Sequence, residues 1–372
     1  MSLIVRSVRN FVRAEWFLVF SAGTGLAFLL WAHALFGELA SPPWLAVIFV
    51  WLFAAILGSA VAVVRHADGL AARLGEPYGT LILTLSVTFI EVISISAVMT
   101  HGASPTLTRD TLFAVVMIIL NFMVGLSLLL GGWRHREQHY NLQGANAYLG
   151  VIIPLVVLSL ILPDFTLTTP GPTLSGAQQI FLVLVSVGLY AAFLAMQTGR
   201  HRGYFMLAEP DTDAAAASAP RQRPLAFDAI MLIAYMIPVV FLAEQLARPV
   251  DYLIVTLRAP APLAGVVVAV LVATPEAIGA VRAALANHLQ RSVNIFLGSV
   301  LSTIGLTIPA MILVSRLTGR DIVLGVEHTD MVLLLLTLAI SVVTFASGRT
   351  NIMQGAVHLI LFAAYLLLIV QG

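Results

Sequence analysis

The sequence predicts an all-α membrane protein with about eleven transmembrane helices, arranged as one helix followed by two inverted five-helix repeats. Of the 372 residues, 60% are hydrophobic and only 10% are charged, and the mean hydropathy of +0.99 lies far above that of soluble domains. Apolar stretches of about 18 or more residues, long enough to cross a hydrocarbon core as a helix, recur from end to end. The alternation typical of membrane β-strands is absent, which disfavours a barrel.

The first apolar run follows a basic segment, MSLIVRSVRNFVRAEW, and the two together resemble a cleavable signal peptide. We interpret the run as an uncleaved first span, because it is long enough to cross the bilayer. The predicted spans are Trp16–Leu35, Trp44–Val64, Tyr78–Met99, Thr111–Gly131, Ala145–Leu162, Gln178–Met196, Phe227–Leu246, Leu263–Ala284, Ser292–Val314, Asp330–Ala346 and Ile352–Val370.

The distribution of arginine predicts the orientation of these spans. All nineteen basic residues are arginine, and fourteen of them fall in the N-terminal segment and the loops after the even-numbered spans. Five fall in the loops on the other side. Because basic residues favour the cytoplasmic side, we expect the N-terminus in the cytoplasm and the C-terminus outside.

One polar break, Gly199 to Ala226, interrupts the apolar pattern and is rich in alanine, proline and arginine, as linkers are. It divides the chain into residues 1–43 with the first span, a five-span half at 44–198, a cytoplasmic linker at 199–226 and a second five-span half at 227–372. Because five is odd, two homologous halves would be inverted relative to one another, as in many secondary transporters.

Each half carries one acidic residue deep inside a span. Glu91 lies 13 residues into the third span and Glu276 lies 13 residues into the eighth. At about 1.5 Å per residue, each carboxylate lies roughly 20 Å from its own entry face, which is close to the bilayer midplane. Intramembrane carboxylates are energetically unfavourable and mark ion or proton pathways, so both are candidate sites for ions and protons.

Polar and helix-disrupting residues accompany both acids. Thr80, Thr84 and Thr88 share a helical face with Glu91, although such hydroxyls also commonly bond to their own helix. In LVATPEAIGAV, Pro275 disfavours helix at Thr274 and predicts a broken span, with an ordinary proline kink as the alternative. Glycines that would allow close helix packing are Gly265, Gly279, Gly298 and Gly305.

The span after each acid offers further oxygen ligands. Asn121 follows Glu91, and Ser299, Ser302 and Thr303 follow Glu276. Carboxylate, hydroxyl and amide oxygens suit Ca²⁺ or an alkali cation, and the absence of cysteine excludes thiolate ligands. A low dielectric favours the protonated form of a carboxylate, so protons and a cation can compete for the same oxygens.

Three other polar features carry less weight. Glu244 lies near the outer end of the seventh span, where it would reach the interface or serve ion access. The segment from His135 to His139 has metal-ligand residue types, but its order and basic surroundings favour a solvated loop. His358 in the last span is interpreted as a packed, hydrogen-bonded histidine.

Two blocks resemble the alpha-repeats of the cation/calcium exchanger superfamily, and most closely its bacterial calcium (sodium, potassium)/proton antiporters of the ChaA-like branch. The first is GEPYGTLILTLSVTFIEV with NFMVGLSLLLGGWRHREQHYN downstream, and the second is VATPEAIGAVRAALANHLQRSVNIFLGSVLSTIGLTIP. The resemblance implies that Glu91 and Glu276 bind the metal ion and exchange protons beside Asn121 and Ser299 to Ser302, and that Glu244 is a secondary acid. It also implies a bacterial inner-membrane location.

The chain departs from the family pattern where amide ligands are usual. Val87-Thr88 and Val272-Ala273 stand where Gly-Asn pairs are typical, and Ser302 replaces a glutamine. Fewer amide oxygens make Na⁺ or K⁺ a serious alternative to Ca²⁺.

We therefore expect a secondary cation/proton antiporter that exports Ca²⁺, Na⁺ or K⁺ by alternating access. The expected partners are membrane lipid, small cations and protons, with no cofactor and no nucleic acid. The alternatives are a channel, for which no filter-like loop or charged ring is evident, and a membrane enzyme, for which no catalytic set is evident.

Overall fold

The computed structural model describes residues 15–74, 78–101, 105–206 and 224–371, which are largely helical. Within these residues, nine helical segments are long and apolar enough to cross a membrane, and two shorter apolar helices cover Thr84–Met99 and His328–Thr344. These eleven segments correspond to the eleven predicted spans, so the predicted number of membrane helices is confirmed. Residues 207–223 of the predicted linker lie outside the described residues.

The chain divides into two compact units, each built from residues on both sides of that linker. Unit 1 comprises residues 1–103 and 223–259, and unit 2 comprises residues 104–222 and 260–372. The two acids therefore belong to different units, Glu91 to unit 1 and Glu276 to unit 2. The inverted five-helix repeats remain a prediction.

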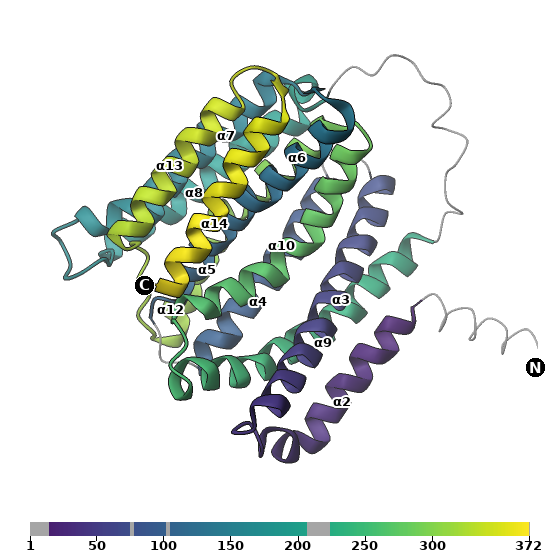
Figure 1. The fold of residues 1–372 in the computed structure, drawn as a ribbon, viewed down its shortest axis with the longest axis vertical. Helices are drawn as coiled ribbons and strands as arrows, with labels where there is room; N and C mark the ends of the chain where they lie inside the picture. Colours follow the sequence, from purple (N-terminus) through teal and green to yellow (C-terminus); the bar gives the residue numbers. More distant parts are fainter. Residues whose placement is uncertain (1–14, 75–77, 102–104, 207–223, 372) are drawn as a thin grey trace, which may run out of the picture. The chain divides into compact units, whose positions relative to one another are not determined.

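Unit 1 is a bundle of four helices in which α3 packs extensively against α9 and α4 packs against both. Figure 1 shows α2 alongside α3. Helix α3 continues ten residues beyond the predicted end of the second span at Val64, because its last turns carry charged groups that find partners on other helices. The elements are α2 (Trp16–Phe36), α3 (Pro42–Leu74), α4 (Tyr78–His101), α9 (Leu225–Asp251) and the π-helical η6 (Tyr252–Thr256).

Unit 2 contains the remaining helices. Its first part consists of α5 (Leu107–Met117), η1 (Ile118–Met123), α6 (Val124–His135), β1 (Gln138–His139), α7 (Leu142–Val156), η2 (Val157–Ile161), η3 (Leu162–Phe165), α8 (Gly176–Thr198) and η4 (Arg202–Phe205). Its second part consists of α10 (Pro262–Leu285), α11 (Leu289–Ser302), η7 (Thr303–Thr307), α12 (Ile308–Thr318), α13 (His328–Thr344), β2 (Arg349–Thr350) and α14 (Ile352–Gln371).

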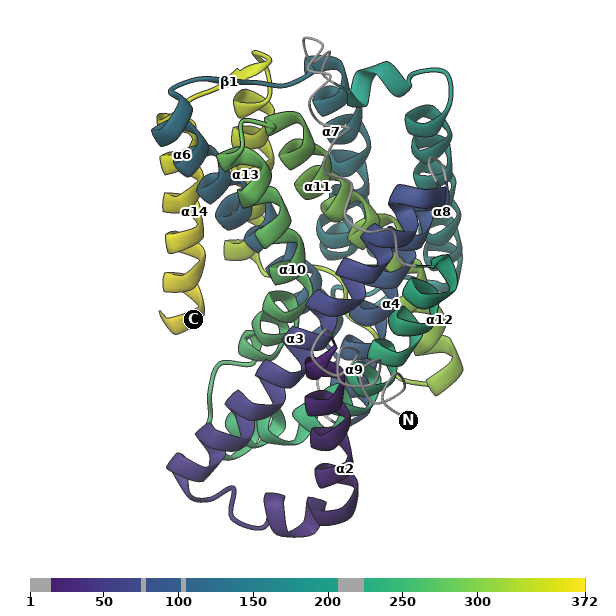
Figure 2. The ribbon, with the colours of Figure 1, turned by 90° about the vertical axis from the view of Figure 1, so that its right-hand side faces the viewer.

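Helix α10 is held in unit 2 by close packing. It lies against α5 and α11, and α6 lies against α14, which Figure 2 shows beside it. A Cβ atom at Gly265 would come within 2.6 Å of the Asp110 carbonyl carbon, so only glycine allows α10 to approach α5 this closely. At Gly279 the corresponding distance to the Ile295 side chain is 3.6 Å, an ordinary contact. The predicted close approach is therefore found at Gly265 but not at Gly279.

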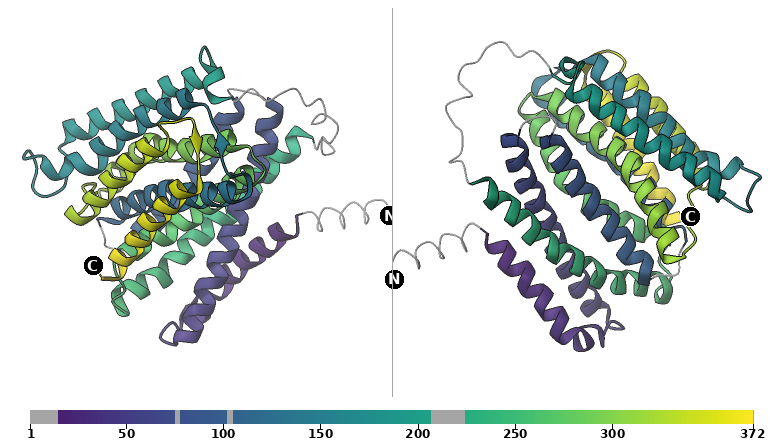
Figure 3. Two further views of the ribbon diagram at one scale, coloured as in Figure 1. Left: turned by 45° about the horizontal axis from the view of Figure 1, so that its top comes forward. Right: turned by 180° about the vertical axis from the view of Figure 1, so that it is seen from behind.

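A short two-stranded ribbon joins the segment after α6 to the segment before α14 (Figure 3). Gln138 pairs with Thr350 in antiparallel register. The Gln138 side chain is buried and donates from Nε2 to the carbonyl oxygen of Ala284 at 2.8 Å, and His135 Nε2 lies 2.9 Å from that of Leu285. The expected solvated loop is therefore found at Arg136, Glu137 and His139, which are exposed, but not at Gln138, because the last carbonyls of α10 need hydrogen-bond donors.

Irregular helix occurs in unit 2, but not at the predicted position. Helix α10 is continuous through Pro275, so the predicted break there is wrong. Two π-helical segments instead lie in the spans that follow those of the two acids. Segment η1 contains Asn121, and segment η7 begins directly after Ser302. Because a π-helical turn contains extra residues, it changes which face later side chains occupy, and such segments are frequent at functional sites.

Candidate functional site

Glu91 lies in a buried polar stripe on α4. It is 1% exposed, and Thr88 and Ser94 lie three residues before and after it on the same helical face, also buried. Within the described residues, the hydroxyls of Thr88 and Ser94 form no hydrogen bond. Buried polar atoms normally have hydrogen-bond partners, so two unsatisfied hydroxyls on the same face as a carboxylate are candidate ligands for a cation. The predicted stripe included Thr88 but not Ser94, which the same spacing rule identifies.

Two threonines, Thr80 and Thr84, precede Thr88 in the predicted stripe. Thr84 is half-buried, and the side chain of Thr80 lies outside the described part of the chain. Ser86 on the same helix is buried and donates its hydroxyl to the Ile82 carbonyl oxygen at 2.7 Å. A hydroxyl of α4 therefore does bond to its own helix at Ser86, but not at Thr88.

Glu276 is half-buried on α10, and the neighbouring helix holds its carboxylate. The hydroxyl of Ser299 on α11 donates to Glu276 Oε2. Packing of α10 against α11 brings these two residues, 23 positions apart in the sequence, together. A hydroxyl that donates to a carboxylate orients it and stabilises its charged form.

Two other predicted ligands bond to their own helices. Ser302 donates its hydroxyl to the Ser299 carbonyl oxygen at 2.9 Å, and Thr274 donates to the Val270 carbonyl oxygen at 2.5 Å. A hydroxyl oxygen keeps acceptor lone pairs when its hydrogen is donated, so both remain chemically able to contact a cation.

Asn121 is fully buried in η1 and faces a polar network from α13 and α14. Its Nδ2 donates to Thr337 Oγ1 at 2.9 Å, and its Oδ1 lies 3.3 Å from His358 Nδ1. Because the amide oxygen only accepts, His358 Nδ1 is the donor, and Nε2 then accepts from the Thr344 hydroxyl at 2.9 Å. His358 is packed and hydrogen-bonded as predicted, whereas its link to Asn121 was not anticipated.

Glu244 is exposed on α9, but not at the end of its helix. Helix α9 continues to Asp251, and η6 extends it to Thr256. The helix therefore continues through Arg248 and Pro249 instead of ending at Leu246, and the position of Glu244 near the outer end of the membrane span stays a prediction.

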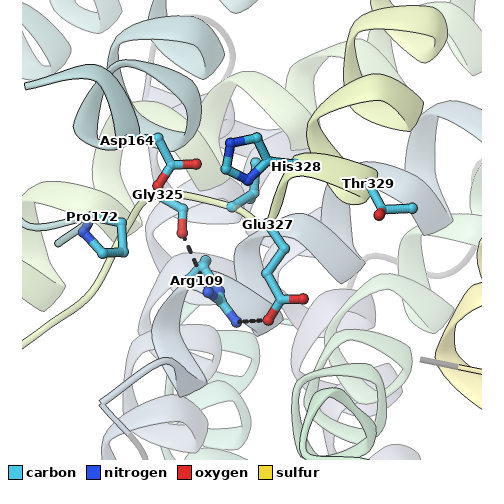
Figure 4. Close-up of a pocket in the computed structure, with 8 residues that line it drawn as sticks. Arg109, Asp164, Pro172, Gly325, Glu327, His328 and Thr329 are labelled. Carbon is cyan, nitrogen blue, oxygen red and sulfur yellow. Dashed lines mark hydrogen bonds and ion pairs between the residues drawn. The ribbon is translucent and has the colours of Figure 1, made fainter.

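A separate cavity of about 370 Å³ lies in unit 2, and Figure 4 shows it. The Arg109 guanidinium in the cavity wall donates to the carbonyl oxygen of Gly325 and to Glu327 Oε1, both at 3.4 Å. It also donates to Asp110 Oδ1 at 2.8 Å. None of the predicted site residues lines this cavity, whose walls are formed by Arg109, Asp164, Pro172, Gly325, Val326, Glu327, His328 and Thr329.

The chain is similar to known proteins in family, sequence and fold. The family described as sodium/calcium exchanger protein matches residues 44–199 and 227–371. A Sinorhizobium fredii protein named as an ionic transporter is 42% identical over 352 residues, which cover 93% of each chain. The sodium-potassium/proton antiporter ChaA of Escherichia coli is 41% identical over 318 residues, which cover 84% of this chain and 86% of that protein.

The fold is also similar to solved structures. The structure of native YfkE superposes with a TM-score of 0.74 at 18% identity, and the match covers 96% of this chain and all of that one. At this identity the similarity concerns the fold alone.

Proposed function

The chain belongs to the sodium/calcium exchanger protein family, and on that premise we propose that it is a secondary active cation/proton antiporter. One observation carries the proposal: a fully buried carboxylate, Glu91, lies beside two hydroxyls that form no hydrogen bond within the described residues. Such oxygens are ligands for hard cations, and a buried carboxylate is also a proton acceptor. The similarity to an Escherichia coli antiporter supports the same reaction class.

The binding residues of this proposal are Glu91 and Glu276, which alternate between binding the cation and binding protons. Ser299 holds Glu276, and Thr88 adds a hydroxyl near Glu91. Further ligands are Asn121, Ser302 and Thr274, and Glu244 serves access. In the transport cycle, the binding residues are exposed alternately to the two sides of the membrane.

Na⁺ or K⁺ is the cation that the ligand set supports best, with Ca²⁺ as the alternative. Ca²⁺ takes six to eight oxygen ligands, preferably with several carboxylates and amides. Here Val87 and Val272 occupy positions before the acids and Ser302 is a short hydroxyl, so the number of strong oxygen ligands is small. The relative that is 41% identical is named for sodium and potassium.

Transport into sealed vesicles tests the function. Purified protein in proteoliposomes with an imposed pH gradient is exposed in turn to Na⁺, K⁺ and Ca²⁺, while a pH-sensitive dye reports the gradient. We expect saturable collapse of the gradient by Na⁺ or K⁺ at clamped voltage. Cation current that needs no protons would indicate a channel, and no response to any of the three ions would refute antiport. A response to Ca²⁺ alone would reverse the ion assignment.

The proposed orientation, with the N-terminus in the cytoplasm, is tested separately. The chain contains no cysteine, so single cysteines in the Arg134–Glu137 loop and in the Thr166–Thr173 loop report sidedness without background. An impermeant thiol reagent added to intact cells is expected to label only the second.

A further inference from the structure

A buried histidine in unit 1 lies between carboxylates from two other segments. His66 on α3 is 1% exposed, and its Nδ1 lies 2.9 Å from Oδ1 of Asp228 on α9. Its Nε2 lies 3.5 Å from Oε2 of Glu15, the residue that precedes α2. The ring stacks on Tyr235 with centroids 5.8 Å apart. This buried, titratable side chain of α3 therefore contacts both α9 and the residue that precedes α2, and the proposed transport cycle does not use it.

Other charged and titratable groups surround this histidine. Arg65 contacts both Glu15 Oε2, at 2.5 Å, and His66 Nε2, at 3.1 Å, and its side chain is half exposed. Tyr235 donates its hydroxyl to Glu15 Oε2 at 3.1 Å. The Arg73 guanidinium lies 3.9 Å from Asp228 Oδ2. The remaining acids on α3 and on α4, which packs against α3, are Asp68, which is exposed, and Glu91.

The packing of α3 leaves room for this arrangement. A Cβ atom at residue 69 would lie 3.1 Å from Asp228 Oδ2, and Gly69 avoids that contact. Glycine one turn after His66 therefore lets the α9 carboxylate reach the helix surface beside the imidazole. The Asp228 carboxylate, His66 and Gly69 together form one polar site.

The hydrogen-bond chemistry gives this site two states. Asp228 accepts as a carboxylate, so Nδ1 of His66 carries the hydrogen in both. Arginine only donates, so in the neutral imidazole Nε2 accepts from Arg65. When Nε2 binds a proton it must donate instead, and Glu15 Oε2 is the acceptor beside it. The half-exposed Arg65 side chain then hydrogen-bonds with water instead of with His66.

We propose that His66 is a proton-binding site that controls how the start of α2 is anchored to α3 and α9. In the protonated state a buried imidazolium links Glu15 to Asp228. In the neutral state the half-exposed Arg65 takes over the contact with Glu15. This proton stays in unit 1 and is distinct from the protons exchanged at the carboxylates, so the inference goes beyond the proposed function and does not depend on it.

Hydrogen–deuterium exchange of the full-length protein in lipid nanodiscs tests this site without requiring transport. Protection factors of amides in the first two turns of α2 are measured at about pH 6 and about pH 8, on either side of the range where histidine changes charge. We expect protection on the order of tenfold greater at the lower pH, because the buried charged hydrogen bond replaces one at a solvent-exposed arginine.

Matched variants decide whether His66 is the cause. His66→Asn keeps a donor near the Nδ1 position but does not titrate, so the pH difference should disappear. His33→Asn alters an exposed histidine at the other end of α2 and should leave the pH difference intact. A pH difference that persists in His66→Asn, or that is absent from the wild type, would overturn the proposal.

Arg65 provides a second, independent test that tolerates failure of the histidine variant to fold. Arg65→Gln removes the arginine contact with Glu15 in the neutral state and leaves the one from Tyr235, so protection at about pH 8 should fall while protection at about pH 6 stays unchanged. Equal losses at both pH values would show that Arg65 is a purely structural contact and would contradict the two-state arrangement. Failure of antiport in vesicles would leave these exchange measurements unaffected.

Discussion

The two intramembrane acids have different surroundings, although they occupy equivalent depths in their predicted spans. Glu91 is 1% exposed on α4, beside the hydroxyls of Thr88 and Ser94, which form no hydrogen bond within the described residues. Glu276 on α10 is half-buried, and Ser299 from the next helix donates to its carboxylate. A hydroxyl from another helix therefore orients the Glu276 carboxylate, whereas the two hydroxyls near Glu91 are available as ligands under the proposed function. The two acids are expected to respond differently to changes in their neighbours.

The largest effect is expected where the acids themselves are changed. Glu91→Gln and Glu276→Gln should each abolish cation/proton exchange, because glutamine keeps the shape but neither charges nor releases a proton. Exchange is measured in proteoliposomes after confirming that each variant is folded by its thermal unfolding profile. Glu38→Gln, at an exposed acid outside the helices, is the matched control and should retain exchange. Substantial exchange by the Glu91→Gln or the Glu276→Gln variant would refute the proposed role of that acid in transport.

Ser299→Ala sharpens the comparison on the side of Glu276. Loss of a hydrogen bond to a charged group corresponds to about 1.5–3 kcal/mol, so the half-saturating cation concentration should rise roughly ten- to a hundredfold. Ser299→Thr, which keeps the hydroxyl, should recover part of the affinity. An unchanged affinity in the alanine variant would mean that Ser299 does not orient the carboxylate during transport.

Thr88→Val and Ser94→Ala probe the side of Glu91, with a smaller expected effect. Each removes one neutral hydroxyl, so the half-saturating cation concentration should rise several-fold, by about 0.5–1.5 kcal/mol. Unfolding temperature should stay constant or rise, because a buried hydroxyl without a hydrogen bond is destabilising. Ser86→Ala on the same helix removes a hydroxyl that is bonded to the Ile82 carbonyl oxygen, and it should leave cation affinity unchanged. The opposite pattern would assign the ion site to another face of α4.

Gly265→Ala has the smallest expected effect on cation affinity and tests the support of α10. The added methyl would meet the Asp110 backbone at 2.6 Å, so overpacking should lower the free energy of unfolding by about 1–3 kcal/mol. Gly279→Ala on the same helix makes an ordinary 3.6 Å contact and serves as the control. Thermal unfolding of both purified variants gives the comparison. Equal stability would show that α5 yields to the extra methyl.

Much of the architecture follows from residue chemistry along the chain. Long apolar stretches predicted all eleven helical segments, because an isolated membrane segment must satisfy its backbone internally as helix. The ends were less predictable. Helix α3 extends past Val64 through Arg65, His66 and Arg73, whose charges pair with Glu15 and Asp228 far away in the sequence.

Predictions from the local sequence were wrong where packing against neighbouring helices compensates for a local disruption of the helix. Pro275 removes one backbone donor, yet α10 stays continuous because it is packed along its length against α5 and α11. Irregular turns lie instead at η1 and η7. No proline or glycine precedes Asn121 in the helix that leads into η1, whereas η7 itself contains Gly305. Gln138 was not singled out by its residue type, and it caps α10 only because the ribbon brings it there.

The sequence alone determined the membrane class, the number of helices and the two acids at midspan depth, because hydropathy, length and the rarity of buried charge are properties of each segment separately. The tertiary structure decided which oxygen atom meets which partner. Ser299 donates to Glu276, Asn121 bonds to Thr337 and His358, and His66 bridges two carboxylates. These contacts join residues from different helices, and hydrogen bonds depend on distances of a few ångströms that only the packing of those helices sets.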